Sequence, residues 1–140
     1  MKAIITIGVP GSGKSTYAAS LSPEFYEINR DEIREWLFGT DYQQNSTDEK
    51  AVNTRVNQAL ALAVFIKQDI IISDTNLNPK YRKILVDKLL RLGYNVVYKE
   101  FPITYDEMRK RNLEREDKPL IPSNVLTRMW TSYERYIAGE

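Results

Sequence analysis

The sequence predicts an α/β protein in which a mostly parallel sheet of about four strands is flanked by helices. Three observations favour this fold class. Short runs of branched apolar residues alternate with longer segments of helical periodicity, the first run leads directly into a glycine-rich loop, and 42% of the 140 residues are hydrophobic, which suffices for one core. We therefore expect residues 1–140 to form a single domain.

The expected strands are short and apolar. Residues 3–8 are branched and apolar, as in a strand buried on both faces, and residues 69–73 contain three consecutive isoleucines. Residues 25–28 and 94–101 are two further candidates. Because helical segments separate these runs, the strands are predicted to pair in parallel, and a ligand is expected beyond their carboxyl ends.

Helix starts are predicted from polar capping residues. The predicted caps are Asn78 followed by Pro79, Thr104 with Glu107, Ser46 with Glu49, and Ser123. The helices that follow them are expected from 79 to Gly93, from 105 to about 115, over 51–67, and from 123 toward 139. One more helix is expected after the glycine-rich loop, and another over 31–38, with Ile33, Trp36 and Leu37 turned toward the core.

Composition excludes several kinds of site. The chain contains no histidine and no cysteine, which excludes imidazole bases, thiolate nucleophiles, disulfides and the usual zinc and iron–sulfur sites. Proton transfer therefore falls to a carboxylate, a lysine or a tyrosine. The first apolar run is too short to span a bilayer, so no membrane segment and no membrane partner are expected.

The charges are unevenly distributed along the chain. The net charge is +1, but residues 24–50 hold eight acids and three bases, a sum of −5, while residues 80–115 hold ten bases and five acids, a sum of +5. A basic half on a nearly neutral protein suits a surface that faces phosphates. Two solvated helix faces would give the same pattern.

The glycine-rich loop matches the phosphate-binding motif G-x-x-x-x-G-K-[ST] at every specified position. The matching residues are Gly8, Val9, Pro10, Gly11, Ser12, Gly13, Lys14 and Ser15, and Thr16 follows. In such a loop the backbone N–H groups surround phosphates, the lysine reaches the β- and γ-phosphates, and the hydroxyl binds Mg²⁺. The sequence therefore predicts binding of a nucleoside triphosphate. The short chain, without a guanine-reading N-K-x-D motif, favours a small kinase.

A kinase needs a group that accepts the proton of the acceptor hydroxyl, and Asp31 is the candidate. It follows the second predicted strand and shares a helix face with Arg34, which is suited to an acceptor phosphate. An ordinary first-turn acid with a surface salt bridge is the alternative.

Asp74 follows the third predicted strand, where an acid acts on the Mg²⁺ shell through water, holds Arg34 or the acceptor by hydrogen bonds, or closes an Asx turn. Arg111 and Arg115 share one face of a basic helix that either forms a lid over bound phosphates or is simply solvated.

Four segments in this order, GVPGSGKST, NRDEIR, IISDTNLNP and RKRNLER, resemble the kinase domain of bacteriophage polynucleotide 5′-hydroxyl kinases, which have a P-loop kinase fold. Those enzymes transfer the γ-phosphate of ATP to the 5′-hydroxyl of DNA or RNA. The resemblance implies that Lys14 and Ser15 handle ATP and Mg²⁺, that Asp31 is the general base, and that Arg34 grips the 3′-phosphate of the acceptor. It also implies that Asp74, Thr75 and Asn76 line the acceptor site and that Arg115, with Arg111, closes on the ATP phosphates.

We therefore expect an ATP- and Mg²⁺-dependent polynucleotide 5′-hydroxyl kinase of nucleic-acid end repair. It is expected to lack 3′-phosphatase activity, because no D-x-D-G-T motif is present. A small-molecule kinase acting on a nucleoside, sugar or antibiotic hydroxyl is the alternative, and a nucleotide-binding regulatory module without catalysis is a third. The resemblance implies a cytoplasmic location, in the host cell if a phage encodes the chain.

Overall fold

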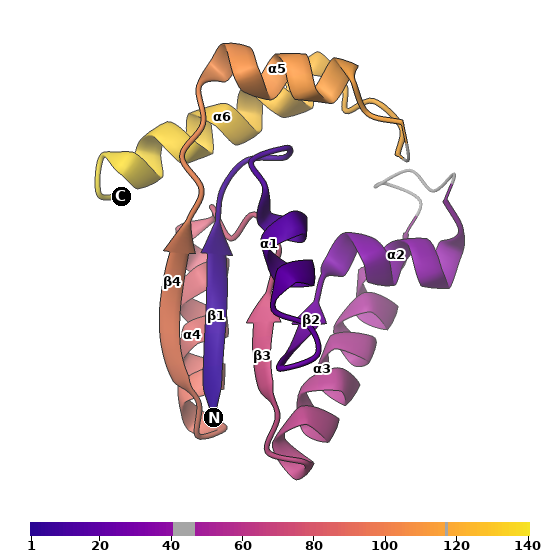
Figure 1. Ribbon diagram of the computed structural model, residues 1–140, viewed down its shortest axis with the longest axis vertical. Coiled ribbons are helices and arrows are strands. Elements are labelled where there is room, and N and C mark those ends of the chain that lie inside the picture. The colour runs from indigo at the N-terminus through magenta and orange to yellow at the C-terminus, as the bar shows by residue number, and fades with distance from the viewer. Residues whose placement is uncertain (41–46, 117) are drawn as a thin grey trace.

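A computed structural model describes residues 1–40, 47–116 and 118–140. Its centre is one sheet of four parallel strands, shown in Figure 1, with the order β2-β3-β1-β4. The strands are β1 (Lys2–Ile7), β2 (Phe25–Ile28), β3 (Asp69–Ile72) and β4 (Asn95–Glu100). The predicted fold class and the four predicted strands are thus confirmed.

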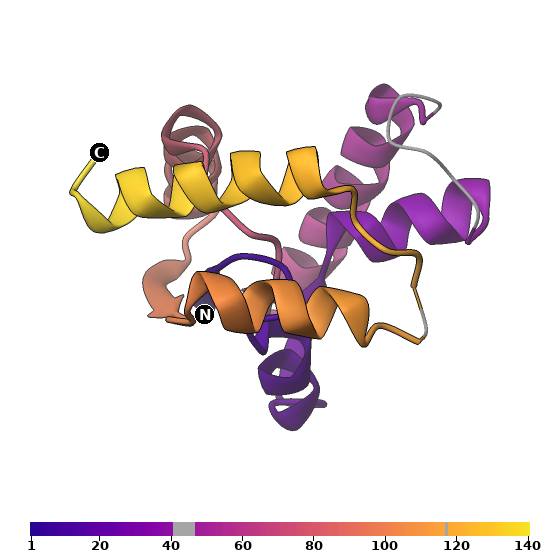
Figure 2. The same ribbon diagram turned by 90° about the horizontal axis from the view of Figure 1, so that it is seen from above.

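Helices cover both faces of the sheet and the carboxyl ends of its strands. They are α1 (Lys14–Ser20), α2 (Arg30–Phe38), α3 (Glu49–Phe65), α4 (Pro79–Arg91), α5 (Tyr105–Leu113) and α6 (Ser123–Ile137). Figures 1 and 2 show α5 and α6 side by side above the strand ends, with α5 over the loop that joins β1 to α1. Within the described residues, no helix is long and apolar enough to cross a membrane.

The central strands β1 and β3 consist mainly of apolar residues because each of their faces is covered. On one face, Ile5 and Ile72 pack with Leu60 of α3 and Leu89 of α4 in the main core. On the other face, a smaller cluster joins the neighbouring strand residues Ile4 and Ile71 to Ala18 of α1. Because helices pack on both faces, the carboxyl ends of β1 and β3 are held rigidly next to each other. The loops that follow these two strands start there, where ligands of such sheets bind.

Two predicted helix caps form as expected. The side chain of Asn78 accepts hydrogen bonds from the backbone N–H groups of Lys80 and Tyr81, at 3.0 and 3.2 Å. The Thr104 hydroxyl accepts one from the N–H of Glu107, at 3.2 Å. Each cap satisfies a donor that the first helical turn otherwise leaves without a partner.

Two other predicted caps are wrong. Helix α3 begins at Glu49 and is capped by Asp48, whose carboxylate accepts from the N–H groups two and three residues on; Ser46, the predicted cap, lies outside the described residues. Ser123 is the first residue of α6 and makes no capping bond, and Pro122 occupies the cap position. The first error arises because several residues before α3 have cap-like chemistry, and the second because α6 begins one residue earlier than the predicted cap implies.

Candidate active site

The loop between β1 and α1 has the backbone shape that phosphate binding needs. Gly11 and Gly13 have φ values of 80° and 107°, in the left-handed region that glycine adopts without strain, and Gly13 is also the N-cap of α1. The N–H of Gly8 donates to the carbonyl of Thr75 at 3.2 Å, which joins this loop to the end of β3. The predicted phosphate loop therefore lies at the carboxyl edge of the sheet, as expected.

Gly8 and Ser12 approach each other closely across this loop. A Cβ added to Gly8 would lie 2.6 Å from Ser12 Oγ and 3.1 Å from Phe101 Cβ, so no larger residue fits without a shift. Ser12 Oγ is itself buried and has no hydrogen-bond partner among the described residues. A buried hydroxyl without a partner is costly, and inside a phosphate loop it is a donor ready for a phosphate oxygen.

Lys14 is the buried cation of the site. Its Nζ donates to the carbonyls of Gly8 and Val9 at 3.0 and 2.8 Å, and the residue is only 8% exposed. Burial lowers the pKa of Lys14 to about 8, while the negative charges of Asp74 and Asp31 act to raise that pKa. Both carboxylates are therefore within electrostatic reach of the lysine, so side chains from the start of α1, the start of α2 and the segment after β3 lie at one site.

Asp31 and Arg34 share one face of α2, as predicted. Arg34 Nη1 lies 2.8 Å from Asp31 Oδ1, and the Asp31 side chain is 61% exposed. Asn29 caps this helix, because its Oδ1 accepts from the N–H of Glu32 at 2.9 Å. The cap fixes the helix start two residues before Asp31, so the carboxylate is presented from a well-defined position.

Asp74 holds the start of α2 from the neighbouring strand. Its Oδ1 accepts from the backbone N–H of Arg30 at 2.8 Å. Burial raises the pKa of Asp74 to about 6, against the lowering effect of that hydrogen bond and of the Arg30 charge. One carboxylate oxygen is thus used to position the helix that carries Asp31, a role that the sequence did not predict.

Thr75 and Asn76 contribute differently from each other. The backbone of Thr75 contacts the phosphate loop through Gly8, and its side chain stays a predicted acceptor contact. Asn76 has a left-handed φ of 52°, and its Nδ2 donates to the carbonyls of Thr6, Ile72 and Asp74 at 2.8, 3.2 and 3.0 Å. The amide nitrogen of Asn76 is therefore committed to the fold, and only its carbonyl oxygen is left for the predicted acceptor contact.

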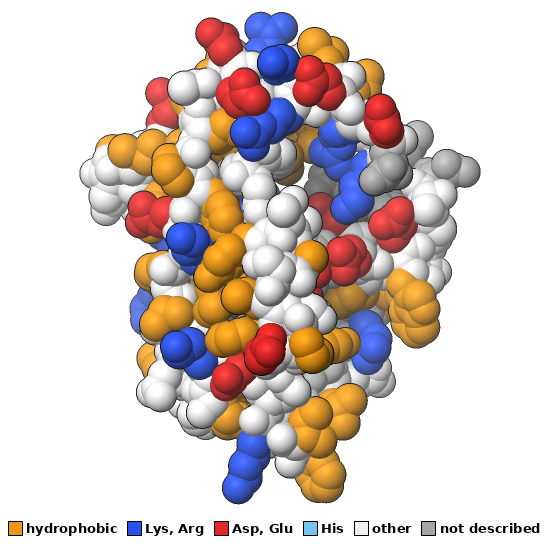
Figure 3. All heavy atoms as spheres, in the orientation of Figure 1, with side chains coloured by type: hydrophobic (Ala, Val, Ile, Leu, Met, Phe, Trp, Pro, Cys, Tyr) orange, Lys and Arg blue, Asp and Glu red, His pale blue; other side chains and the backbone are white. Residues whose placement is uncertain are grey.

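The basic helix α5 lies over the phosphate loop, as a lid would. Arg111 Nη1 donates to the carbonyl of Gly11 at 2.6 Å, and its Nε donates to Glu107 at 3.0 Å. Arg115 follows the end of α5 and is half-buried, and its positive charge lowers the pKa of Lys14, as does that of Lys118. Figure 3 shows this part of the surface hollowed, with blue basic side chains above the hollow and red acidic ones below it.

Mg²⁺ suits the donors at this edge. The Ser15 hydroxyl is exposed in the first turn of α1, and Asp74 supplies a carboxylate nearby. Mg²⁺ prefers oxygen ligands and keeps several waters, so one hydroxyl and one carboxylate together with substrate phosphates fit its needs. In the described part of the chain there is no cluster of three or more acidic side chains that would bind a metal without a nucleotide.

Two sets of contacts escaped the sequence analysis. Asn29 Nδ2 donates to the carbonyl and the hydroxyl of Ser73 at 3.3 and 3.0 Å, and the Ser73 hydroxyl donates to the Glu27 carboxylate. Arg34 is also paired with Glu49 of α3, at 2.6 Å. These partners are 15 to 46 residues apart, so no local pattern reveals them.

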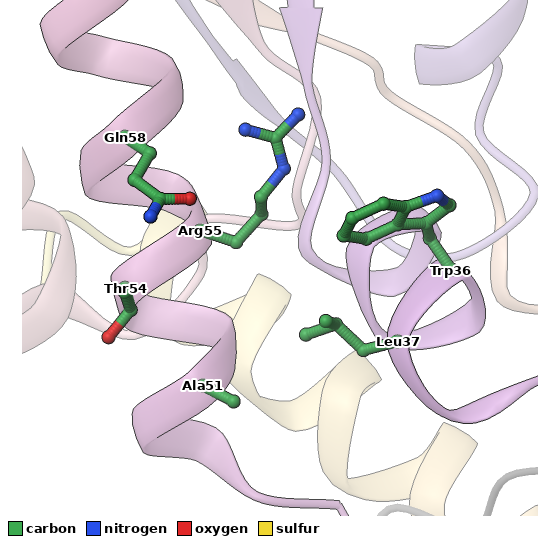
Figure 4. A pocket seen from close by; sticks show the side chains of 6 residues that line it. All are labelled: Trp36, Leu37, Ala51, Thr54, Arg55 and Gln58. Atoms are coloured by element: carbon green, nitrogen blue, oxygen red, sulfur yellow. The ribbon is translucent and has the colours of Figure 1, made fainter.

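A groove of about 470 Å³ lies between α2 and α3 (Figure 4). It is lined by Trp36, Leu37, Ala51, Thr54, Arg55 and Gln58. Trp36, predicted to face the core, is 73% exposed and lies beneath the Arg55 guanidinium, with 5.4 Å from its carbon to the ring centroid. Ile33 and Leu37, four residues apart, pack against the core, as predicted.

Comparisons with known proteins agree with this geometry. A family model described as an AAA domain matches residues 4–138. A protein of Autographa californica nuclear polyhedrosis virus, named as a bifunctional polynucleotide kinase/RNA ligase, is 31% identical over 135 residues and matches 87% of this chain. The L-seryl-tRNA(Sec) kinase of Methanococcus maripaludis is 30% identical over 139 residues, or 94% of this chain.

A solved structure shows the same fold over nearly the whole chain. The Pnkp1/Rnl/Hen1 RNA repair complex contains a chain that superposes with a TM-score of 0.86 at 25% identity, over 99% of the present chain. The present chain spans 19% of the viral protein, 52% of the archaeal one and 46% of the superposed chain. Because the family model matches residues 4–138 and the superposition covers nearly the whole chain, the chain belongs to the AAA domain family and has the fold of the P-loop kinases.

Proposed function

We propose that this chain transfers the γ-phosphate of ATP to the 5′-hydroxyl of DNA or RNA, with Asp31 as the general base. One observation carries the proposal: the Asp31 carboxylate, presented by α2, acts electrostatically on Lys14 of the phosphate loop while it is bonded to Arg34. A proton acceptor, a phosphate-binding cation and a second cation for the acceptor thus lie at one edge of the sheet. The polynucleotide kinase named among the relatives adds weight to a nucleic-acid acceptor.

The transfer follows from these positions. The phosphate loop and Lys14 bind the β- and γ-phosphates, and Arg34 binds the phosphate on the 3′ side of the acceptor nucleotide. Asp31 takes the proton of the 5′-hydroxyl as the oxygen bonds to the γ-phosphorus, and the bond from that phosphorus to the β–γ bridging oxygen breaks to release ADP. Arg115 and Arg111, from above, balance the charge spread over the transferred group.

Mg²⁺, when bound to the β- and γ-phosphates, would neutralise part of their charge. Ser15 would be its protein ligand, and Asp74 would act through water. The raised pKa of Asp74 fits a carboxylate that is costly to ionise unless a cation is near.

The decisive assay is phosphoryl transfer to an oligonucleotide. The protein is incubated with γ-labelled ATP, Mg²⁺ and a 5′-hydroxyl oligonucleotide at low salt, and we expect label at the 5′ end. Asp31→Asn should abolish transfer while the affinity for ATP stays near that of the wild type. Glu35→Gln, which removes an acid from the same helix, is the matched control. Failure of the wild type to label any oligonucleotide would reject the proposal.

An acceptor other than a polynucleotide 5′ end, such as the hydroxyl of a small molecule, is the second candidate, because one relative is named as an L-seryl-tRNA(Sec) kinase and not as a polynucleotide kinase. Both candidates share the phosphate loop and Asp31. A competition experiment distinguishes them. An oligonucleotide with a 5′-hydroxyl should inhibit phosphorylation of a small acceptor only if the 5′ end of the oligonucleotide occupies the acceptor site. A regulatory module without catalysis would bind ATP and give no phosphorylated product from either acceptor.

A further inference from the structure

We propose that Glu49 is a positioning residue that aims the Arg34 guanidinium, and that it thereby sets the preference for acceptors carrying a 3′-phosphate. This inference rests on the proposed function and deepens it. Neither the motif around Asp31 nor the phosphate loop includes Glu49, which lies 15 residues after Arg34 in the first turn of another helix.

The contact between the two residues is bidentate. Arg34 Nε donates to Glu49 Oε2 at 3.0 Å, and Nη2 donates to Oε1 at 2.6 Å. Arg34 Nη1 donates to Asp31 Oδ1 at 2.8 Å. The Arg34 side chain is only 12% exposed, whereas the Glu49 side chain is 49% exposed, so the contact shields the guanidinium more than the carboxylate. The Arg34 hydrogen bond lowers the pKa of Glu49, which keeps this carboxylate ionised.

A count of donors shows what this contact leaves for a ligand. A planar guanidinium has five N–H groups, and the contacts among the described residues use three. Because Glu49 takes the Nε–Nη2 edge, rotation about the Cδ–Nε bond is fixed. The remaining N–H groups, on the two terminal nitrogens, then point away from α3. Such a fixed fork suits a phosphate.

Glu49 is itself held in place. The Thr47 hydroxyl donates to Glu49 Oε2 at 2.9 Å. One helical turn further on, Asn53 Oδ1 accepts from Arg30 Nη2 at 2.6 Å. Glu49 and Asn53, four residues apart on α3, thus contact two arginines that are four residues apart on α2. This double contact fixes the rotation of α2 about its axis, and Glu49 also sets the direction of the Arg34 side chain, which meets the 3′-phosphate of the acceptor.

Whether removal of Glu49 weakens or strengthens phosphate binding distinguishes a role in positioning Arg34 from a role in neutralising its charge. If Glu49 only cancelled the charge of Arg34, its removal would strengthen binding of a phosphate. If Glu49 aims the guanidinium, its removal lets Arg34 turn, and phosphate binding weakens although the site has become more positive. A purely structural ion pair would affect acceptors with and without the 3′-phosphate equally.

The experiment compares kcat/KM for adenosine 3′-monophosphate and adenosine as acceptors, and calorimetric Kd values for the same two compounds. The full chain is used as wild type, Glu49→Gln, Glu49→Ala, Arg34→Ala and the double variant Arg34→Ala/Glu49→Ala. We expect Glu49→Ala to lower the preference for the 3′-phosphorylated acceptor about tenfold through KM, and Glu49→Gln, which keeps one acceptor oxygen, to lower it less. The double variant should lose no more preference than Arg34→Ala.

Asn53→Ala is the matched control, because it removes the other contact between α3 and α2 and leaves Arg34 paired; its preference should equal that of the wild type. If Glu49→Ala shows an unchanged or increased preference for the 3′-phosphorylated acceptor, the inference about Glu49 is wrong and the proposed function still stands. A wild type that phosphorylates both acceptors equally overturns it as well. A wild type that phosphorylates no acceptor, oligonucleotides included, rejects the proposed function and this inference with it. The Kd values test the inference on any variant that folds, whatever its activity.

Discussion

Replacing Asn29 by alanine tests how the start of α2 is held. The side chain caps α2 by accepting from the N–H of Glu32, and its amide donates to the carbonyl and hydroxyl of Ser73 in a buried setting. Loss of an N-cap costs about 1 kcal/mol. Loss of a buried hydrogen bond adds about 1 kcal/mol. We therefore expect Asn29→Ala to lower the free energy of unfolding by about 2 kcal/mol in sum.

The assay is urea unfolding followed by circular dichroism, with m unchanged between variants. Asn78→Ala is the matched control, because Asn78 caps α4 in the same way from an exposed position and makes no buried contact of this kind. We expect it to cost about half as much. If Asn29→Ala cost no more than Asn78→Ala, the buried contacts to Ser73 would contribute nothing, and the account of how α2 is positioned would be refuted.

Three further predictions concern the site. Asp74→Asn keeps an oxygen that accepts from the N–H at the start of α2, and it removes a carboxylate whose pKa burial raises to about 6, so the free energy of unfolding at pH 7 should rise. This gain should shrink as the pH falls from 6 toward 4, because the wild-type folded state then takes up the proton. Unfolding measured as a function of pH tests both expectations. Arg115→Ala should lower kcat on the order of a thousandfold, while Arg109→Ala, on the lid helix, should change it little in steady-state assays. Gly8→Ala should weaken binding of a non-hydrolysable ATP analogue measured by calorimetry, since the new Cβ would lie 2.6 Å from Ser12 Oγ; wild-type affinity would contradict the close packing of the loop.

The sequence predicted the elements well because their signals are local. The isoleucines of β3 and the cap at Asn78 depend on neighbours within a few residues. The cap of α3 was misplaced because Ser46 and Asp48 both have suitable side chains, and only the packed structure selects Asp48. Trp36 was assigned to the core because its spacing from Ile33 is helical, although packing against α3 turned it outward.

For the site, the spacing of Asp31 and Arg34 was sufficient to predict their contact, since both lie on one helix. The contact between Arg34 and Glu49 needed the angle between two helices, which no spacing contains. The same holds for Asn29 and Ser73, which meet only because β2 and β3 are neighbours in the sheet. Sequence patterns thus identified the groups that we propose act on the substrate more readily than the groups that orient them.

The strand order places β4 at the border of the sheet, and this has a practical consequence for handling the protein. Val97 and Tyr98 of this strand are largely exposed, and a border strand offers backbone donors and acceptors to another molecule. Lys99 stands next to them with its ammonium over the Tyr17 ring, where its charge opposes stacking of a second copy. Lys99→Val should therefore promote association of the protein at high concentration, which light scattering detects.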